Sequence, residues 1–146
     1  ESMSFVIFLG GKMVVNHDCL KCIISVFVYS DKAELSIQEL VQNEAVGKYS
    51  TEELKFHLNR LSDEKWIVSN RTTRPYEMLD PQSPSWSVHY WRMSESASQY
   101  WEAVNRIAIW EEFKSKTAGE SLKFSLELLK GYSKSWIESK LNESEI

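Results

Sequence analysis

Few side chains in this sequence have the types and spacing that catalysis or metal binding requires. Cys19 and Cys22 form a CxxC pair, but no second pair and no histidine cluster completes the ligand set of a closed zinc site. We expect two reduced thiols on a helix that faces the core, with a redox pair or a metal site as alternatives. His17, His57 and His89 stand apart, and the sequence has neither a phosphate-cradling glycine loop nor a nucleophile elbow. The sequence therefore predicts no enzyme, no cofactor and no metal.

Side chains that suit nucleic-acid recognition gather between residues 48 and 75. Six basic and four acidic residues give this stretch a charge of +2, in a chain whose net charge is −4. The amide of Asn59 and the guanidinium of Arg60 suit bidentate bonds to base edges in the major groove of DNA. The residues expected to bind phosphates, each with a solvated surface charge as the alternative, are Lys48, Lys55, Arg71 and Arg74. We therefore predict a protein that binds double-stranded DNA.

A helix is expected to present these side chains. Ser50 and Glu53 have the spacing of a capping box, which predicts a helix start. The leucines that follow fall on one helical stripe: Leu54, Leu58 and Leu61. The residues roughly opposite are Glu52, Phe56, Asn59 and Arg60. The pattern then changes at residues 66–68 to aromatic and β-branched residues, which favour a strand. A capped amphipathic helix that leads directly into a strand is typical of a winged helix-turn-helix, which presents that helix to a partner.

Two helices are expected before this one. The first covers residues 19–30, with Asn16 or Asp18 as its cap and an apolar stripe for the core. The second is short, begins at Ser36 and ends near Gly47, because glycine is favoured just past a helix end. Short helices joined through such a turn match the helix-turn-helix pattern.

The wing is expected after the presented helix. Residues 69–85 are polar and contain three prolines, which indicates a long loop rather than an element. Residues 86–93 alternate between apolar and polar, with Trp86, Val88 and Tyr90 on one face, and this alternation predicts the returning strand. Arg71 and Arg74 lie in the connection between the two strands.

Two apolar helices are predicted at the end of the chain, over residues 95–116, capped by Ser94, and over residues 120–141. They carry more apolar surface than one small domain covers, so we expect a homodimer interface. The residues expected in that interface are Trp101, Val104, Ile107, Trp110, Leu122, Leu126, Leu129 and Trp136. A small apolar ligand is conceivable in a pocket at the junction with the wing, although such an aromatic cluster is more often core: Trp86, Trp91, Trp101 and Trp110.

Length and composition favour a folded protein with one substantial core. The chain has 146 residues, 42% of them hydrophobic, with six each of Trp, Tyr and Phe. We expect an α+β, mostly helical fold with an N-terminal strand arm or hairpin (1–15), a winged helix-turn-helix domain (16–98) and a C-terminal helical association region (99–146). The arm either packs on its own chain or exchanges between subunits. We expect neither a membrane span nor a signal peptide, and the cytoplasm as the compartment.

The order of these elements resembles the bacterial winged helix-turn-helix regulators of the PadR and MarR groups. The resemblance covers residues 16–104 and is carried by the segments LSIQELVQ, STEELKFHLNRLSDEKWIV and VHYWRMSESASQYWEAV. It implies a homodimeric transcriptional regulator that places residues 49–61 in the major groove, and so adds Tyr49, Ser50 and Phe56 to the DNA-binding residues. It also implies that the wing lies along the backbone or the minor groove. Lys65 and Trp66 depart from the pattern, because those families usually have glycine and a small aliphatic residue there.

A second function stays open because of Phe56. Its ring either contacts thymine methyl groups, is buried, or marks a protein-binding face. The negative charges of Glu52 and Glu53 would also repel a phosphate backbone, unless these residues only stabilise the helix N-terminus. The alternative function is therefore a winged-helix module for protein association that does not bind DNA. The basic wing favours DNA, whereas the aromatic content and the acidic net charge favour association.

Overall fold

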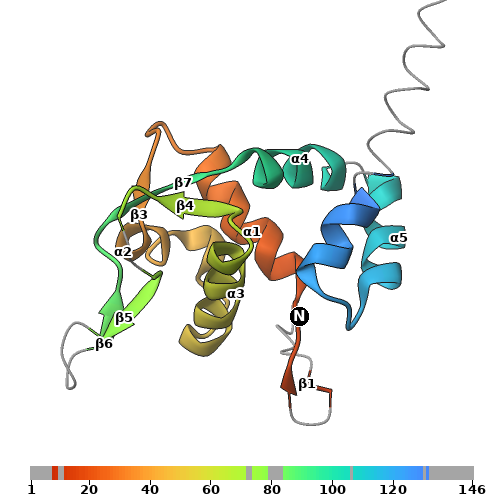
Figure 1. Cartoon of the computed structure of the whole chain (residues 1–146), viewed down its shortest axis with the longest axis horizontal. Helices are drawn as coiled ribbons and strands as arrows, with labels where there is room; N and C mark the ends of the chain where they lie inside the picture. Colours follow the sequence, from red (N-terminus) through yellow and green to blue (C-terminus); the bar gives the residue numbers. More distant parts are fainter. Residues whose placement is uncertain are drawn as a thin grey trace, which may run out of the picture.

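Short strands and helices alternate as far as Met93, and helices follow them (Figure 1). The computed structural model describes residues 8–9, 12–71, 74–78, 84–105, 107–129 and 131, and over these residues the fold is α+β. The elements are β1 (Phe8–Leu9), β2 (Lys12–Met13), α1 (His17–Val28), β3 (Leu35–Ser36), α2 (Ile37–Leu40), the 3₁₀ turn η1 (Glu44–Val46), α3 (Thr51–Asp63), β4 (Ile67–Ser69), β5 (Tyr76–Met78), β6 (Pro84–Trp86), β7 (Tyr90–Met93), α4 (Glu95–Val104) and α5 (Ile107–Thr117), and residues 122–129 form a further helix.

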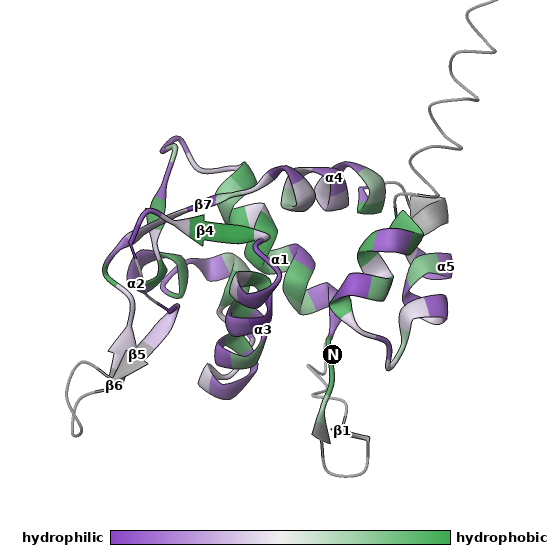
Figure 2. Ribbon diagram, in the orientation of Figure 1, coloured by the Kyte–Doolittle hydropathy of each residue, from purple (hydrophilic) through white to green (hydrophobic). Residues whose placement is uncertain are grey.

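Helix α1 lies at the centre of the core, where it packs against η1, α3, α4 and β7. The side-chain oxygen of Asn16 accepts hydrogen bonds from the N–H groups of Asp18 and Cys19, which confirms Asn16 as the cap. The apolar face of the helix is fully buried or nearly so: Leu20, Ile23, Ile24 and Phe27. Figure 2 shows hydrophobic colours on much of α1 and on β4. Burial of each such side chain contributes about 1.5–3 kcal/mol to folding.

The N-terminal hairpin is confirmed over its described residues. β1 and β2 pair antiparallel, with Phe8 opposite Met13. Residues 1–7, 10 and 11 of the predicted arm lie outside the described residues.

The second predicted helix is shorter than expected. α2 ends at Leu40, and Asn43 then caps the separate turn η1 by accepting a hydrogen bond from the N–H of Ala45. A side chain that bonds nearby backbone groups in this way competes with continuation of the helix. Gly47 follows η1 rather than α2.

The three-stranded antiparallel sheet has the order β3-β7-β4. Trp91 is 1% exposed and lies opposite Leu35 and Ser69, and its indole N–H donates to Ser87 Oγ. Val88 and Tyr90 are 53% and 52% exposed. The predicted face of the returning strand was therefore wrong, because the core takes up the large indole of Trp91 and turns its neighbours outward.

The expected loop over residues 69–85 contains a hairpin instead. β5 pairs antiparallel with β6, with Tyr76 opposite Trp86. Pro75 lies just before β5, and Pro84 is the first residue of β6. Proline is tolerated at the first residue of a strand because its missing N–H interrupts little of the ladder. The prolines therefore limit these strands without excluding them.

The single helix predicted over residues 95–116 is two helices: α4 ends at Val104 with Asn105 as its C-cap, and α5 begins at Ile107. Ser94 is at the N-cap position, but its side chain makes no capping hydrogen bond. The next predicted helix is confirmed over residues 122–129, and its remainder beyond residue 131 lies outside the described residues.

A buried polar cluster ties α1 to the C-terminal helices. His17 Nδ1 is 3.2 Å from the hydroxyl of Tyr100 on α4, and His17 Nε2 is 3.2 Å from Ser125 Oγ on the helix 122–129. The imidazole also packs edge-on to the ring of Phe113, at 4.7 Å between centroids. A neutral imidazole has one donor and one acceptor, which matches two hydroxyl partners. Burial, with further contributions from His57 and Lys114, lowers the pKa of His17 to about 3.

The end of α3 is a Schellman motif that contains a lysine where glycine is usual. The N–H of Trp66 donates to the carbonyl of Leu61, and the N–H of Lys65 donates to that of Ser62. Lys65 has a φ of 61°, in the left-handed region that side chains with a Cβ disfavour. This closure turns the chain directly from α3 into β4.

We expect Lys65→Gly to stabilise the protein by about 1 kcal/mol, because glycine adopts the left-handed conformation without the Cβ clash. Lys65→Ala is the matched control, since it removes the charge and keeps the Cβ. Chemical denaturation at neutral pH measures both variants. Equal stability of the glycine and alanine variants would contradict strain at this position.

We expect acid to destabilise the protein through His17. Its pKa is lower in the folded state than in the unfolded chain, so below about pH 6.5 the unfolded chain binds more protons and stability falls as pH falls. By linkage, this one group removes about 2–3 kcal/mol between pH 6.5 and 4.5. His17→Gln should flatten the pH dependence of the free energy of unfolding, whereas the control His89→Gln should retain it. An unchanged dependence in His17→Gln would exclude His17 as its source.

Candidate nucleic-acid interface

The start of helix α3 and the side that it buries agree with the sequence prediction. Ser50 Oγ accepts a hydrogen bond from the N–H of Glu53, and Glu53 Oε1 accepts one from the N–H of Ser50, so the capping box is confirmed. The three leucines of the predicted stripe are buried: Leu54, Leu58 and Leu61. On the other side Glu52 and Arg60 are exposed, whereas Phe56 and Asn59 are half-buried.

The buried side of α3 is wider than the leucines alone indicate. Glu53 and His57 are also buried. His57 Nε2 accepts a hydrogen bond from the N–H of Asn16 at 2.8 Å, so Nδ1 carries the ring proton and donates to the carbonyl of Glu53 at 2.7 Å. Burial lowers the pKa of His57 and keeps it neutral at pH 7. The leucine spacing does not predict this contact, although positions 53 and 57 adjoin the leucine stripe on a helical wheel.

Tyr49 does not belong to the accessible surface of this site. It is 7% exposed, belongs to the hydrophobic core, and its hydroxyl lies 3.8 Å from Cys22 Sγ. Burial raises the pKa of this hydroxyl. Its expected role in DNA contact is therefore corrected to a role in packing the start of α3 on α1. Lys48, next to it, is exposed and lies over its ring, at 5.4 Å from the centroid.

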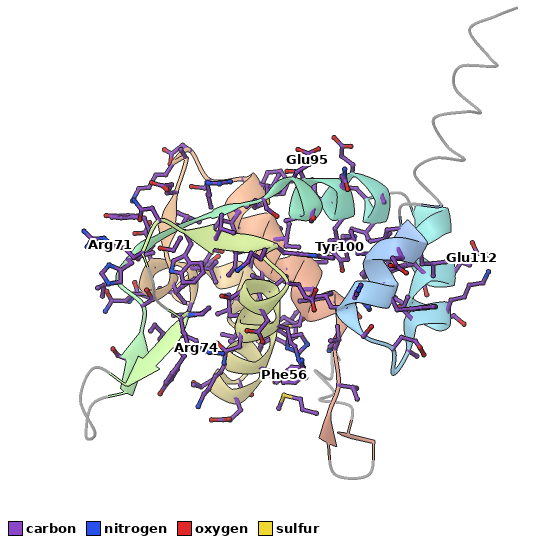
Figure 3. The ribbon with its side chains drawn as sticks, viewed as in Figure 1. Phe56, Arg71, Arg74, Glu95, Tyr100 and Glu112 are labelled. Carbon is purple, nitrogen blue, oxygen red and sulfur yellow. The ribbon has the colours of Figure 1, made fainter. Side chains whose placement is uncertain are left out.

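Asn59 and Phe56 are less accessible than their positions on the helix predict. The side-chain oxygen of Asn59 is buried and has no hydrogen-bond partner within the described structure. Phe56 stacks under the guanidinium of Arg60, at 5.2 Å from its ring centroid. Both Phe56 and Arg60 line a cavity of about 290 Å³ whose other walls are residues 13–15, Glu64 and residues 119–122. Figure 3 shows Phe56 and Arg74 on opposite sides of α3.

The basic side chains of the site come from α3 and from the segment after β4. Arg71 and Arg74 are exposed, and the guanidinium of Arg74 lies 3.6 Å from the carboxylate of Asp63. Lys55 Nζ lies 4.6 Å from the centroid of the Tyr76 ring. The structure therefore brings cations from separate parts of the sequence to one side of α3.

The predicted dimer residues lie mostly inside the chain. The buried ones are Val104, Trp110, Leu122 and Leu129, and the partly buried ones are Trp101 and Leu126. The side chain of Ile107 and residue Trp136 lie outside what the structure describes. Within the described residues, α4 packs on α1 and the helix 122–129 contacts it through Ser125, so these side chains are buried within the same chain.

The tryptophan cluster likewise belongs to the core. Trp91 and Trp110 are buried, and Trp86 and Trp101 pack against the core from its edge. None of these rings lines the cavity beside Phe56. The favoured prediction for these tryptophans, core packing, is therefore confirmed, and the alternative of a ligand pocket is not.

The cysteines are arranged as free thiols. Cys19 is fully buried on α1 and Cys22 is half-buried. Burial raises the pKa of the Cys19 thiol, which makes it a poor nucleophile. Within the described residues, no three His, Cys, Asp or Glu side chains group to hold a metal ion. The helices of that part of the chain also lack the length and apolar content needed to cross a membrane.

The chemistry available at this site is recognition of an anionic, hydrogen-bonding surface. Arg60 offers a planar set of donors from an exposed position on α3, and Lys48, Arg71 and Arg74 are further exposed cations. Glu52, Asp63 and Glu64 oppose these charges locally. In comparisons with protein-family models, curated proteins and solved structures, nothing matches the chain.

Proposed function

We propose that this protein is a winged helix-turn-helix protein that binds double-stranded DNA. In this proposal α3 is the recognition helix in the major groove, and the segment that contains Arg71 and Arg74 follows the phosphate backbone. The observation that carries the proposal is the exposed side chain of Arg60 on α3, together with the exposed Arg71 and Arg74 in the segment between β4 and β5.

The connectivity supports the proposal. The helices α1, α2 and α3 alternate with the strands of a sheet ordered β3-β7-β4, and α3 leads through a tight turn into β4. In a helix-turn-helix the second helix of the pair enters the major groove, and here that helix is α3. Figure 1 shows α3 and the β5–β6 hairpin extending in the same direction from the body of the molecule.

The roles of individual side chains follow from their exposure. Arg60 is the residue for base edges, because its guanidinium is exposed and suits a bidentate bond to guanine. Asn59 is not assigned this role, since a bidentate bond to adenine needs its side-chain oxygen, which is buried. The residues proposed to bind phosphates are Lys48, Lys55, Arg71 and Arg74.

A second candidate function is protein association. The observation that favours it is the pair Val88 and Tyr90, just before and at the start of β7, whose side chains are exposed to solvent. A homodimer that reads two half-sites about 34 Å apart would need a surface of this kind, because the C-terminal helices are engaged within the chain.

We expect the protein to bind duplex DNA with an affinity that falls as salt increases, because phosphate contacts release counterions. A duplex selected from a randomised pool at about 50 mM salt provides the probe, and fluorescence anisotropy measures the dissociation constant over a salt series. Arg60→Ala should weaken binding to this duplex by about 1–3 kcal/mol and relax its sequence preference.

Lys116→Ala is the control variant. Lys116 is an exposed lysine on α5, outside the proposed interface, and it pairs with Glu112. This variant should bind the duplex as the wild type does. No selectable duplex at low salt, together with self-association in sedimentation, would favour the association module instead.

A further inference from the structure

Two of the cations assigned to phosphates already have partners inside the protein. Lys55 Nζ lies over the ring of Tyr76, and Arg74 lies beside the carboxylate of Asp63. Both contacts join α3 to the chain at the start of the β5–β6 hairpin. We call these two contacts the side-chain latch.

The α3 side of the latch is one stripe of the helix. Lys55, Asn59 and Asp63 are spaced four residues apart and therefore lie on the same face. Asn59 lies between the two latch contacts, and its buried oxygen has no hydrogen-bond partner among the described residues. A buried acceptor without a donor is unfavourable.

The backbone beside the latch is held separately. The N–H of Ser87 donates to the carbonyl of Pro75 at 2.8 Å, and the N–H of Gln38 donates to the carbonyl of Ser87 at 3.1 Å. The Tyr76 ring also packs edge-on to Trp86, at 4.8 Å between centroids. Because these contacts fix the base of the hairpin, the latch side chains can exchange partners while the strands keep their positions.

The latch contacts are weak compared with the contacts that a phosphate offers. The Arg74 and Asp63 side chains are 68% and 52% exposed, so water screens their attraction. Lys55 and Tyr76 are half-buried and interact through the ring quadrupole. Charge-assisted hydrogen bonds to phosphate are stronger than either contact, and they gain further from counterion release.

We propose that the latch is autoinhibitory: Tyr76 and Asp63 occupy Lys55 and Arg74 in the free protein, and duplex phosphates displace them. This inference rests on the proposed DNA binding. It also assigns a role to Tyr76, which carries no charge. The Tyr76 ring lowers the affinity for DNA because Lys55 must leave the ring before it can bind a phosphate.

The test compares Tyr76→Leu with Tyr76→Phe. Removal of the ring frees Lys55 without changing the net charge, so Tyr76→Leu should bind the selected duplex about twofold to fivefold more tightly than the wild type. Tyr76→Phe keeps the ring and should bind as the wild type does. Unchanged or weaker binding by Tyr76→Leu would overturn the latch, because a residue that only positions the wing, or that contacts DNA, loses affinity when it is removed.

A measurement on the wild type covers the case in which Tyr76→Leu does not fold. In the free protein the Tyr76 ring current should shift the Lys55 Hε resonances upfield, and duplex at saturation should return them toward the positions of the Lys116 resonances. Lys55 resonances that stay upfield in the complex overturn the latch and leave DNA binding intact. Absence of duplex binding by both wild type and Tyr76→Leu overturns the proposed function and the latch together.

Discussion

The packing of α3 on the start of α1 is the constraint on which the rest of the structure depends. Leu58 and Leu61 are fully buried there, and His57 joins the two helices by accepting the N–H of Asn16, the residue that caps α1. The direction of each side chain on a helix is fixed at 3.6 residues per turn, so the burial of these residues determines which ones face outward. Because His57 and Leu61 on either side of it point into the core, the side chain of Arg60 points to solvent. The proposed interface is therefore a consequence of this contact rather than an independent feature of the surface.

The sequence predicted the parts of the fold that depend on neighbouring residues. The capping box of Ser50 and Glu53, the cap at Asn16 and the buried leucines are local signals, and the structure confirms each of them. It did not predict the parts decided by distant contacts. The inward face of Trp91 and the cover that the C-terminal helices give to α1 depend on which surfaces compete for the same core. The β5–β6 hairpin is absent from the sequence prediction because proline content alone does not distinguish a loop from strands that have proline at or before their first residue.

The candidate site shows the same division between local and distant information. A helical wheel places Asn59 and Arg60 together on the outer side of α3, and for Arg60 this is what the structure has. The wheel contains no information about the burial of the Asn59 side-chain oxygen, nor about residues 13–15, which line the same cavity as Phe56. Tyr49 was misassigned for a similar reason. It lies at the entry to α3, where only the packing against α1 decides whether the ring faces in or out.

Charge determines what kind of binding such a site can support. The chain as a whole is acidic, with a net charge of −4, so long-range attraction to a polyanion is absent and only the local pattern favours DNA. Glu52, Asp63 and Glu64 are exposed, as Arg60 is, and their negative charges offset part of the local positive charge. Two further cations, Lys55 and Arg74, contact Tyr76 and Asp63. Few phosphates can then be neutralised, which limits nonspecific affinity because that affinity comes almost entirely from counterion release. For such a protein, one guanidinium that bonds a base edge adds more to sequence specificity than further positive charge would. We therefore expect a marked preference for one DNA sequence together with a modest overall affinity.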